Sequence, residues 1–334
     1  MGIGVNGIVG SGVYLLIAPL AQVAGGSSVA GVLGCGALCV LIALCFAELS
    51  SLYDRSGGPY VYARDAFGKH VGFAVGWLGM ATGVLGLAAV SVGFATALDR
   101  FVPAASLARV PVAAFLSIFM MSGFEYTAVP AGEVRDARRT VPLAVVGSIS
   151  GASLLYALLQ LAALGALPDV ALREQPLPDV AARALGSWGA PLLGATALLS
   201  MLGFCASVAL VAPRYFTALA EDGHLPRALA GLSTRGTPAL AIAASTAFAA
   251  ALAIVLGYAS LVDVSNVVIL SGYALTCLAA LVLRVRRPEA PRRYRPALLI
   301  PVLAFTAAVA LLVSARPRAA EWRFAALLLG AGFA

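Results

Sequence analysis

The sequence predicts an all-α polytopic membrane protein with about ten transmembrane helices, and three observations support this fold class. Hydrophobic residues make up 61% of the 334 residues and charged residues only 11%, whereas a soluble globular chain carries about 25% charged residues. Apolar runs long enough to cross a hydrocarbon core of ~30 Å recur along the whole chain. The basic residues behind the net charge of +7 lie between those runs, so membrane orientation explains them better than nucleic acid does.

Ten apolar segments are expected to span the lipid bilayer. They cover residues 2–22, 29–52, 71–97, 111–130, 141–167, 190–220, 238–258, 261–283, 297–314 and 322–334. The stretch 168–187 is polar and amphipathic and contains Pro176 and Pro178, so we expect an interfacial loop with a short helix there. The first segment has no basic region before it, so it is expected to stay as a span.

The distribution of Arg and Lys predicts the orientation in the membrane. With a cytoplasmic N-terminus, the inside loops would hold fifteen of these residues and the outside loops seven. Basic residues are enriched on the cytoplasmic side of membrane proteins. We therefore expect a multi-pass protein of the cell membrane with both termini in the cytoplasm.

The first segment contains an interruption that the rest of the chain is expected to surround. Gly10, Ser11 and Gly12 lie at mid-membrane depth, where each glycine costs a helix about 1 kcal/mol relative to alanine. An unwound turn in the membrane is tolerated where it faces protein or water, and transporters use such turns as binding sites. Close packing of a glycine-rich helix against a neighbour explains the same residues equally well.

A second interruption, in the segment 111–130, favours the binding-site interpretation. Gly123, Glu125 and Pro130 fall within eight residues of this segment. Two interrupted helices are the best sequence indication of a transporter site. A carboxylate inside the membrane is costly unless it is paired or protonated, and it usually serves a function. We therefore expect a functional role for Glu125.

Other polar residues within the spans are given structural roles. Glu48, near a basic loop, is expected to have a structural role, with a functional role as the alternative. Asp263, Ser265 and Asn266 are expected to cap the eighth segment, with an outer vestibule as the alternative. A polar stripe on the fifth segment includes Tyr156 and Gln160, and contacts between helices explain it as well as a pore lining does.

The sequence contains no pattern typical of an enzyme. His70 and His224 lie in different loops, and no P-loop or nucleophile elbow is present. The five cysteines lie in apolar runs without the spacing of metal ligands. We therefore expect no enzymatic activity, no cofactor and no metal site.

Four motifs resemble those of the amino acid–polyamine–organocation permease superfamily. Residues 7–14 are similar to the signature of that family's first helix, and residues 46–68 to its second helix and first cytoplasmic loop. Residues 123–142 resemble the end of the sixth helix with the following loop. Residues 219–238 resemble the loop between the eighth and ninth helices. The motifs occur in the family's order and cover nearly the whole chain.

The resemblance implies a leucine-transporter-type inverted-repeat fold and an amino acid substrate, with a coupling proton as a further partner. Substrate would bind between the broken first and sixth helices. Gly10, Ser11 and Gly12 would then offer amides to its carboxylate, and Gly123 would lie in the matching break. Phe119 matches the aromatic residue that closes over the substrate, with packing as the alternative. Glu125 would serve a cationic substrate or the coupling proton.

The chain departs from the family between its third and fourth segments. The thirteen residues from Leu98 to Val110 cannot hold the family's fourth and fifth helices. We therefore expect one transmembrane domain with an incomplete first repeat (1–97), a second repeat (111–285) and two additional helices (297–334).

The surfaces that the two missing helices would cover are expected to face lipid or a second copy of the chain, and small and polar residues on the third segment suit helix contacts in a homo-oligomer more than contacts with lipid. These residues are Gly76, Thr82, Gly83, Gly86, Ser91 and Gly93. The alternative to a permease that moves amino acids by alternating access is a transport-inactive remnant or a partner-binding membrane subunit.

Overall fold

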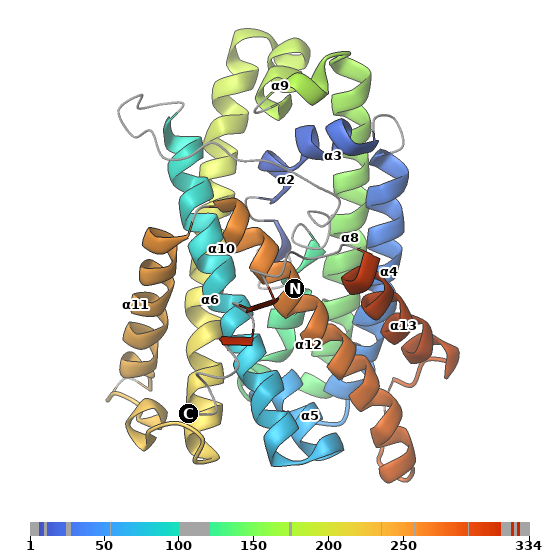
Figure 1. Cartoon of the computed structure of the whole chain (residues 1–334), viewed down its shortest axis with the longest axis vertical. Helices are drawn as coiled ribbons and strands as arrows, with labels where there is room; N and C mark the ends of the chain where they lie inside the picture. The colour runs from blue at the N-terminus through green and yellow to red at the C-terminus, as the bar shows by residue number, and fades with distance from the viewer. Residues whose placement is uncertain are drawn as a thin grey trace.

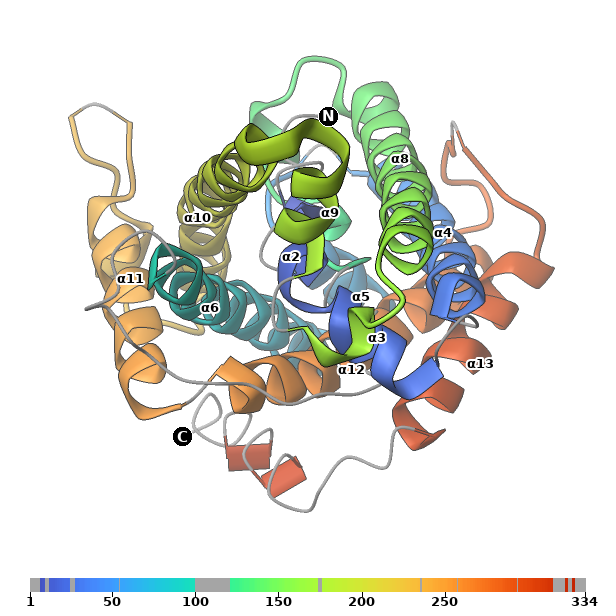
Figure 2. The same ribbon diagram turned by 90° about the horizontal axis from the view of Figure 1, so that it is seen from above.

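The computed structural model describes residues 7–9, 12–24, 28–53, 55–99, 121–173, 176–234, 236–256, 258–292, 294–314, 322–323 and 326–327. Every regular element within these ranges is helical, which confirms the all-α prediction. The long helices surround a short helix, α2, near the middle of the molecule (Figures 1 and 2).

The first segment is interrupted, as the sequence predicts. Gly7 and Ile8 are helical, Val9 forms a bend, and helices α2 (Gly12–Leu15) and α3 (Ile17–Ala24) follow with a second bend at Leu16 between them. The chain then forms α4 (Ser28–Ser50), α5 (Pro59–Phe67) and α6 (Lys69–Asp99). Proline opens α5, where its fixed φ suits the first turn and its missing N–H costs no hydrogen bond.

The second interruption is also present. The 3-10 helices η2 (Phe124–Ala128) and η3 (Ala131–Glu133) replace an α-helix after Gly123. The remaining elements are α8 (Ala137–Ala166), η4 (Val170–Leu172), α9 (Pro176–Leu185), η5 (Gly186–Trp188), α10 (Gly189–Glu221), η6 (Arg227–Ala230), α11 (Ala239–Val255), α12 (Tyr258–Arg286) and α13 (Leu299–Ser314). The loop and short helix expected at 168–187 are thus confirmed.

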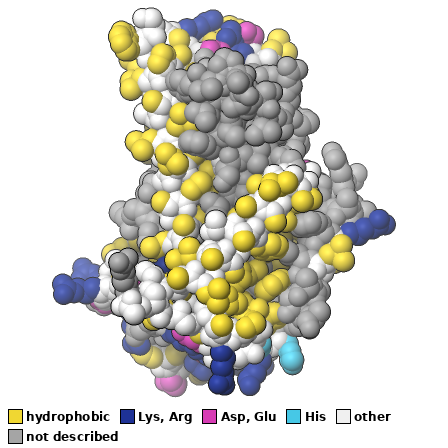
Figure 3. Space-filling view, turned by 90° about the vertical axis from the view of Figure 1, so that its left-hand side faces the viewer, with side chains coloured by type: hydrophobic (Ala, Val, Ile, Leu, Met, Phe, Trp, Pro, Cys, Tyr) yellow, Lys and Arg dark blue, Asp and Glu magenta, His cyan; other side chains and the backbone are white. Residues whose placement is uncertain are grey.

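Four helices among the described residues are long and apolar enough to cross a membrane: 28–50, 137–166, 176–221 and 260–286. Two shorter apolar helices cover 239–255 and 299–313. One face of the molecule carries many hydrophobic side chains between ends where Lys and Arg side chains gather (Figure 3). The chain is therefore a polytopic membrane protein. Half of the fourth predicted segment and most of the tenth lie outside the described residues.

Helices α5 and α9 lie at opposite ends of the molecule (Figure 1), and we refer to the α5 end and the α9 end. A buried charge cluster at the α5 end joins α4 to α12. Arg284 Nε donates to Glu48 Oε1 at 2.8 Å, and Arg292 Nε lies 3.3 Å from the same oxygen. The three side chains are at most 6% exposed. The structural role predicted for Glu48 is confirmed.

One other expectation is wrong. Helix α12 begins at Tyr258, several residues before Asp263, Ser265 and Asn266, so these residues lie within the helix and do not cap it. The small and polar residues of α6 that the structure describes face this chain's own interior and so do not support a second copy, and the homo-oligomer stays a prediction.

Contacts of the α6 residues show this directly. A Cβ added to Gly76 would lie 2.9 Å from Tyr60, and one added to Gly86 would lie 3.3 Å from Phe204. Gly83 faces Ala212 in the same way, and Thr82 is buried. The side chains at 91 and 93 lie outside the described residues.

Candidate functional site

The two interrupted segments touch backbone to backbone at Gly7 and Gly123. A Cβ added to Gly123 would lie 2.1 Å from the carbonyl oxygen of Gly7, and one added to Gly7 would lie 2.7 Å from the carbonyl oxygen of Gly123. Gly123 also has a φ of +115°, which side-chain-bearing residues rarely adopt. Glycine at both positions therefore permits the junction of the two breaks.

Neighbouring helices satisfy the carbonyl groups that the first break frees. The hydroxyl of Tyr156 on α8 donates to the carbonyl of Ile8 at 2.9 Å. The hydroxyl of Ser200 on α10 donates to the carbonyl of Val9 at 2.6 Å. Because lipid supplies no donors, a break at membrane depth needs such partners from protein or water. The Tyr156 part of the α8 polar stripe therefore serves contacts between helices.

Gln160 extends the same set of contacts toward the α9 end. Its Nε2 atom donates to the hydroxyl of Ser28 at 2.9 Å and to the carbonyl of Ile17 at 3.4 Å. The side chain is 1% exposed. Helix α8 thus holds the first segment at two levels, on both sides of the break.

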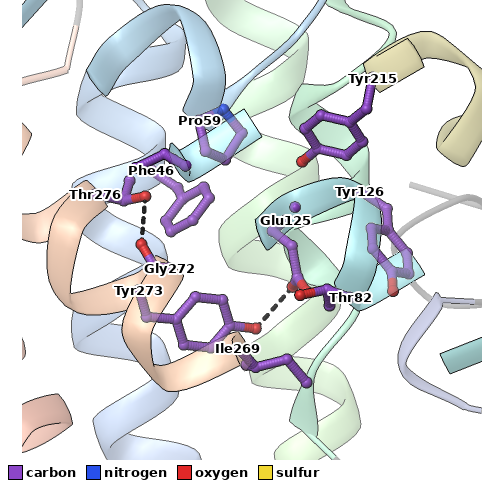
Figure 4. A pocket seen from close by; sticks show the side chains of 12 residues that line it. Phe46, Pro59, Thr82, Glu125, Tyr126, Tyr215, Ile269, Gly272, Tyr273 and Thr276 are labelled. Atoms are coloured by element: carbon purple, nitrogen blue, oxygen red, sulfur yellow. Dashed lines mark hydrogen bonds between the residues drawn. The ribbon is translucent and has the colours of Figure 1, made fainter. Parts of the chain in front are cut away.

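Glu125 follows the second break and is buried, at 5% exposed. Its Oε2 atom accepts hydrogen bonds from the backbone N–H of Gly123 and from the hydroxyl of Tyr273 on α12, both at 2.8 Å (Figure 4). Its Oε1 atom has no hydrogen-bond partner among the described residues. One oxygen therefore ties η2 to α12, and the other is available.

Aromatic rings fix the position of Tyr273. Its ring centroid lies 5.8 Å from that of Phe46 on α4 and 5.3 Å from that of Phe124 on η2. Phe46 and Phe124 also meet edge to face at 5.6 Å. Such pairs stabilise a packed site beyond their buried area, so the Tyr273 hydroxyl is held in place beside Glu125.

A cavity of about 30 Å³ lies beside Glu125, large enough for a water molecule. Its walls come from α4, α5, α6, η2, α10 and α12, and Figure 4 shows the side chains that line it. Residues that represent them are Phe46 of α4, Pro59 of α5, Thr82 of α6, Glu125 of η2, Tyr215 of α10 and Tyr273 of α12. The cavity therefore lies between the second break, at Glu125, and the first residue of α5, Pro59.

The structure brings together part of the predicted site. Gly123 and Glu125 are in direct hydrogen-bonded contact, and Gly12 is the first residue of α2. Gly10, Ser11 and Phe119 lie outside the described residues. No group of three potential metal-ligating side chains is present in the described part of the chain.

Three residues of this region are absent from the site predicted from the sequence: Gly7, Ser200 and Tyr273. Gly7 is the first residue of the stretch 7–14 that resembles the family's first-helix signature. Tyr156 is part of the polar stripe that the sequence predicts on the fifth segment. Ser200 and Tyr273 are single polar residues in long apolar helices, and nothing in the sequence separates them from other such residues.

A protein-family model described as "Amino acid permease" matches residues 1–108 and 99–331 of the chain. An uncharacterized transporter of Mycobacterium tuberculosis is 27% identical over an alignment that covers 88% of this chain and 81% of the relative. A protein of Arabidopsis thaliana named cationic amino acid transporter 4, vacuolar, is 23% identical, with 86% of this chain and 62% of the relative covered.

These comparisons also bear on the junction between the third and fourth predicted segments. The two matched stretches of the family model overlap at residues 99–108. The alignment with the mycobacterial transporter has 356 positions, more than the 334 residues of this chain. It therefore includes positions where only the relative has a residue.

Proposed function

This chain belongs to the amino acid permease family, and we propose that it is a transporter that carries amino acids across the cell membrane by alternating access. The observation that supports this most directly is the contact between the two breaks at Gly7 and Gly123. Interrupted helices that meet near the membrane midplane are typical of transporter binding sites.

In this proposal the substrate binds at the junction of the breaks. The backbone amides of Gly10, Ser11 and Gly12 would hold its carboxylate, and carbonyl groups near Gly123 would receive its amino group. Phe119 would close over the bound substrate. The Tyr156 and Ser200 hydroxyls support this arrangement because they hold the first break in place.

We assign the coupling proton to Glu125. Glu125 has no ion pair with a cationic side chain in the part of the chain that the structure describes, and burial makes an unpaired ionised carboxylate costly. The available Oε1 atom provides a position for a proton. The adjacent cavity has room for water. The hydrogen bonds to Oε2 keep the carboxyl group oriented while Oε1 gains and loses the proton.

The α5 end would face the cytoplasm, with both termini on that side. The clustering of Arg residues at 55–64 and 284–295 at this end supports the orientation. A protein of the cell membrane oriented in this way would open the Glu125 cavity toward the cell interior during one half of the cycle.

A second candidate function is a transport-inactive chain that binds a membrane partner. The two-part family match and the gapped alignment favour it, because they fit the absence of two family helices between Leu98 and Val110. Under the permease proposal, uptake by the 334-residue chain is expected to be weak, and inserting the two helices of a close relative should raise it.

Amino acid binding separates the two candidates without requiring full transport. The purified chain is incubated with a radiolabelled mixture of amino acids, and Gly12→Leu is measured beside it. The permease proposal predicts saturable binding that Gly12→Leu abolishes, since a side chain at the break would fill the space of the carboxylate. If the folded parent chain binds no amino acid, the result favours the transport-inactive candidate.

A further inference from the structure

A loop rich in arginine joins α12 to α13 at the α5 end of the molecule. Residues 284–295 contain six arginines and one acidic residue, Glu289. The acidic residues that pair with this loop, Glu48 and Asp65, each neutralise one more positive charge. The loop therefore keeps a net positive charge at the end of a membrane helix, a pattern typical of binding to anionic lipid headgroups.

Two of these arginines use their donors inside the chain and fix the shape of the loop. Arg284 Nη2 donates to the carbonyl of Pro296 at 2.7 Å, in addition to its contact with Glu48. Arg292 Nη2 donates to the carbonyl of Leu283 at 2.8 Å, in the last turn of α12. These contacts hold the loop against the end of α12, so the outward-facing residues of the loop have fixed positions.

Arg295 lies on the outer side of this loop. It is exposed and forms none of the ion pairs found within the described residues. Beside it, Tyr294 is 39% exposed, and Leu298 and Leu299, where α13 begins, are each 62% exposed. We call these four residues the Arg295 patch. A cation next to a tyrosine and two leucines matches the boundary between lipid headgroups and acyl chains.

Helix α13 places the patch at the edge of the hydrocarbon layer. The helix packs against α12 and α4 and lies at the periphery of the molecule (Figures 1 and 2). Its outer face is apolar and exposed at Val302, Leu303 and Val313, as contact with lipid requires. Arg295 precedes α13 by only a few residues, and the long side chain of an arginine near a helix end reaches the headgroup layer.

We propose that the Arg295 patch binds an anionic phospholipid, with the headgroup phosphate on the Arg295 guanidinium and the acyl chains along the exposed leucines of α13. Arginine binds phosphate through two parallel hydrogen bonds, and the positive end of the α13 dipole adds to the attraction. A soluble anion would contact the guanidinium but not the leucines, whereas a phospholipid contacts the whole patch. The proposal goes beyond amino acid transport and does not depend on it.

Quenching of tryptophan fluorescence by brominated lipids tests the proposal. The three native tryptophans are replaced by phenylalanine, and Leu303→Trp places a reporter on the exposed face of α13. Leu210→Trp, at an exposed position of α10, is the matched reporter away from the patch. Each protein is reconstituted in vesicles of dioleoylphosphatidylcholine that contain brominated phosphatidylglycerol or brominated phosphatidylcholine. The ratio of the two quenching curves gives the relative binding constant of the two headgroups.

The reporter at 303 is expected to show about fivefold tighter binding of phosphatidylglycerol, since one arginine near an anionic surface contributes about 1 kcal/mol. The reporter at 210 should show no preference. Arg295→Gln should remove the preference at 303, and Arg295→Lys should keep most of it because the charge remains. Arg227→Gln, which removes an exposed charge on η6 beside α10 and α11, should behave like the parent.

Equal quenching by the two lipids at position 303 of the parent would overturn the proposal, and so would a full preference in Arg295→Gln. Loss of the preference in Arg227→Gln would also overturn it, because total charge rather than the patch would then be responsible. Inorganic phosphate at matched ionic strength should leave the preference unchanged. If it abolishes the preference, the patch binds a soluble anion and the assignment to lipid is wrong. Failure of the chain to carry amino acids would leave all these results unaffected.

Discussion

Replacing Tyr156 by Phe removes one hydroxyl group. The variant tests whether α8 holds the first break in the conformation that binds the amino acid substrate. Tyr156 and Ile8 are 1% and 2% exposed, so water does not replace the donor that the Ile8 carbonyl loses. A buried carbonyl left without its partner costs about 1–3 kcal/mol. If that cost falls on the binding-competent form, amino acid affinity drops by about 5- to 150-fold.

The assay is equilibrium binding of a radiolabelled amino acid to the purified variant. Ser148→Ala is the matched control on the same helix, because its hydroxyl donates at 3.1 Å to the carbonyl of Val145 within α8. That carbonyl belongs to the helix ladder and keeps a backbone partner. The control is expected to bind like the parent.

Ser200→Ala extends the same test to Val9. A double variant of Tyr156 and Ser200 should lose less affinity than the two single losses added together, since both hydroxyls hold one bend. Unchanged affinity in Tyr156→Phe, with folding intact, would refute the reasoning that this hydroxyl positions the site.

Three further predictions concern stability and orientation. Glu48→Gln leaves Arg284 buried without its anion and should lower stability by ~3–5 kcal/mol, seen as a lower thermal midpoint in detergent. Burial opposes ionisation of Asp222, but the hydrogen bonds that it accepts from Tyr60 and from nearby arginines outweigh burial and lower its pKa below the ordinary 3.8. The stabilisation from the ionised carboxylate is therefore present above pH 3.8 and is lost as the pH falls below that value. Asp222→Asn should consequently flatten the fall in thermal midpoint between about pH 5 and about pH 3. Single cysteines at Arg287 and Arg183 should react with an impermeant thiol reagent from inside and outside the cell, respectively, and reaction of position 287 in intact cells would reverse the orientation.

The membrane spans and both interruptions could be predicted because their signals are local. Length and hydrophobicity identify a span from consecutive residues, and glycine and proline within an apolar run indicate a break. Gly123 and Glu125 were found in this way. The prediction that Asp263 caps a helix was wrong because the signal it used is also local. A polar residue near an apolar run looks the same in the sequence whether the helix starts at that residue or earlier, at Tyr258.

Partners far apart in the sequence could not be predicted. Ser200 reaches Val9 across 191 residues, and Arg284 reaches Glu48 across 236. A serine in an apolar helix carries no signal of which carbonyl it will face, since that depends on how helices pack in three dimensions. The burial of the Glu48 charge predicted that it needed a partner, but the identity of that partner came only from the fold.

Amino acid binding by Gly123→Ala tests most directly whether the substrate binds at the junction of the two breaks. An added Cβ would lie 2.1 Å from the Gly7 carbonyl oxygen and would separate the two breaks, whereas a Cβ at Gly151 on α8 meets open space. Saturable binding is expected for the parent and for Gly151→Ala, and no binding is expected for Gly123→Ala although its helical content is retained. Binding by Gly123→Ala equal to that of the parent would contradict a substrate site at the junction of the breaks.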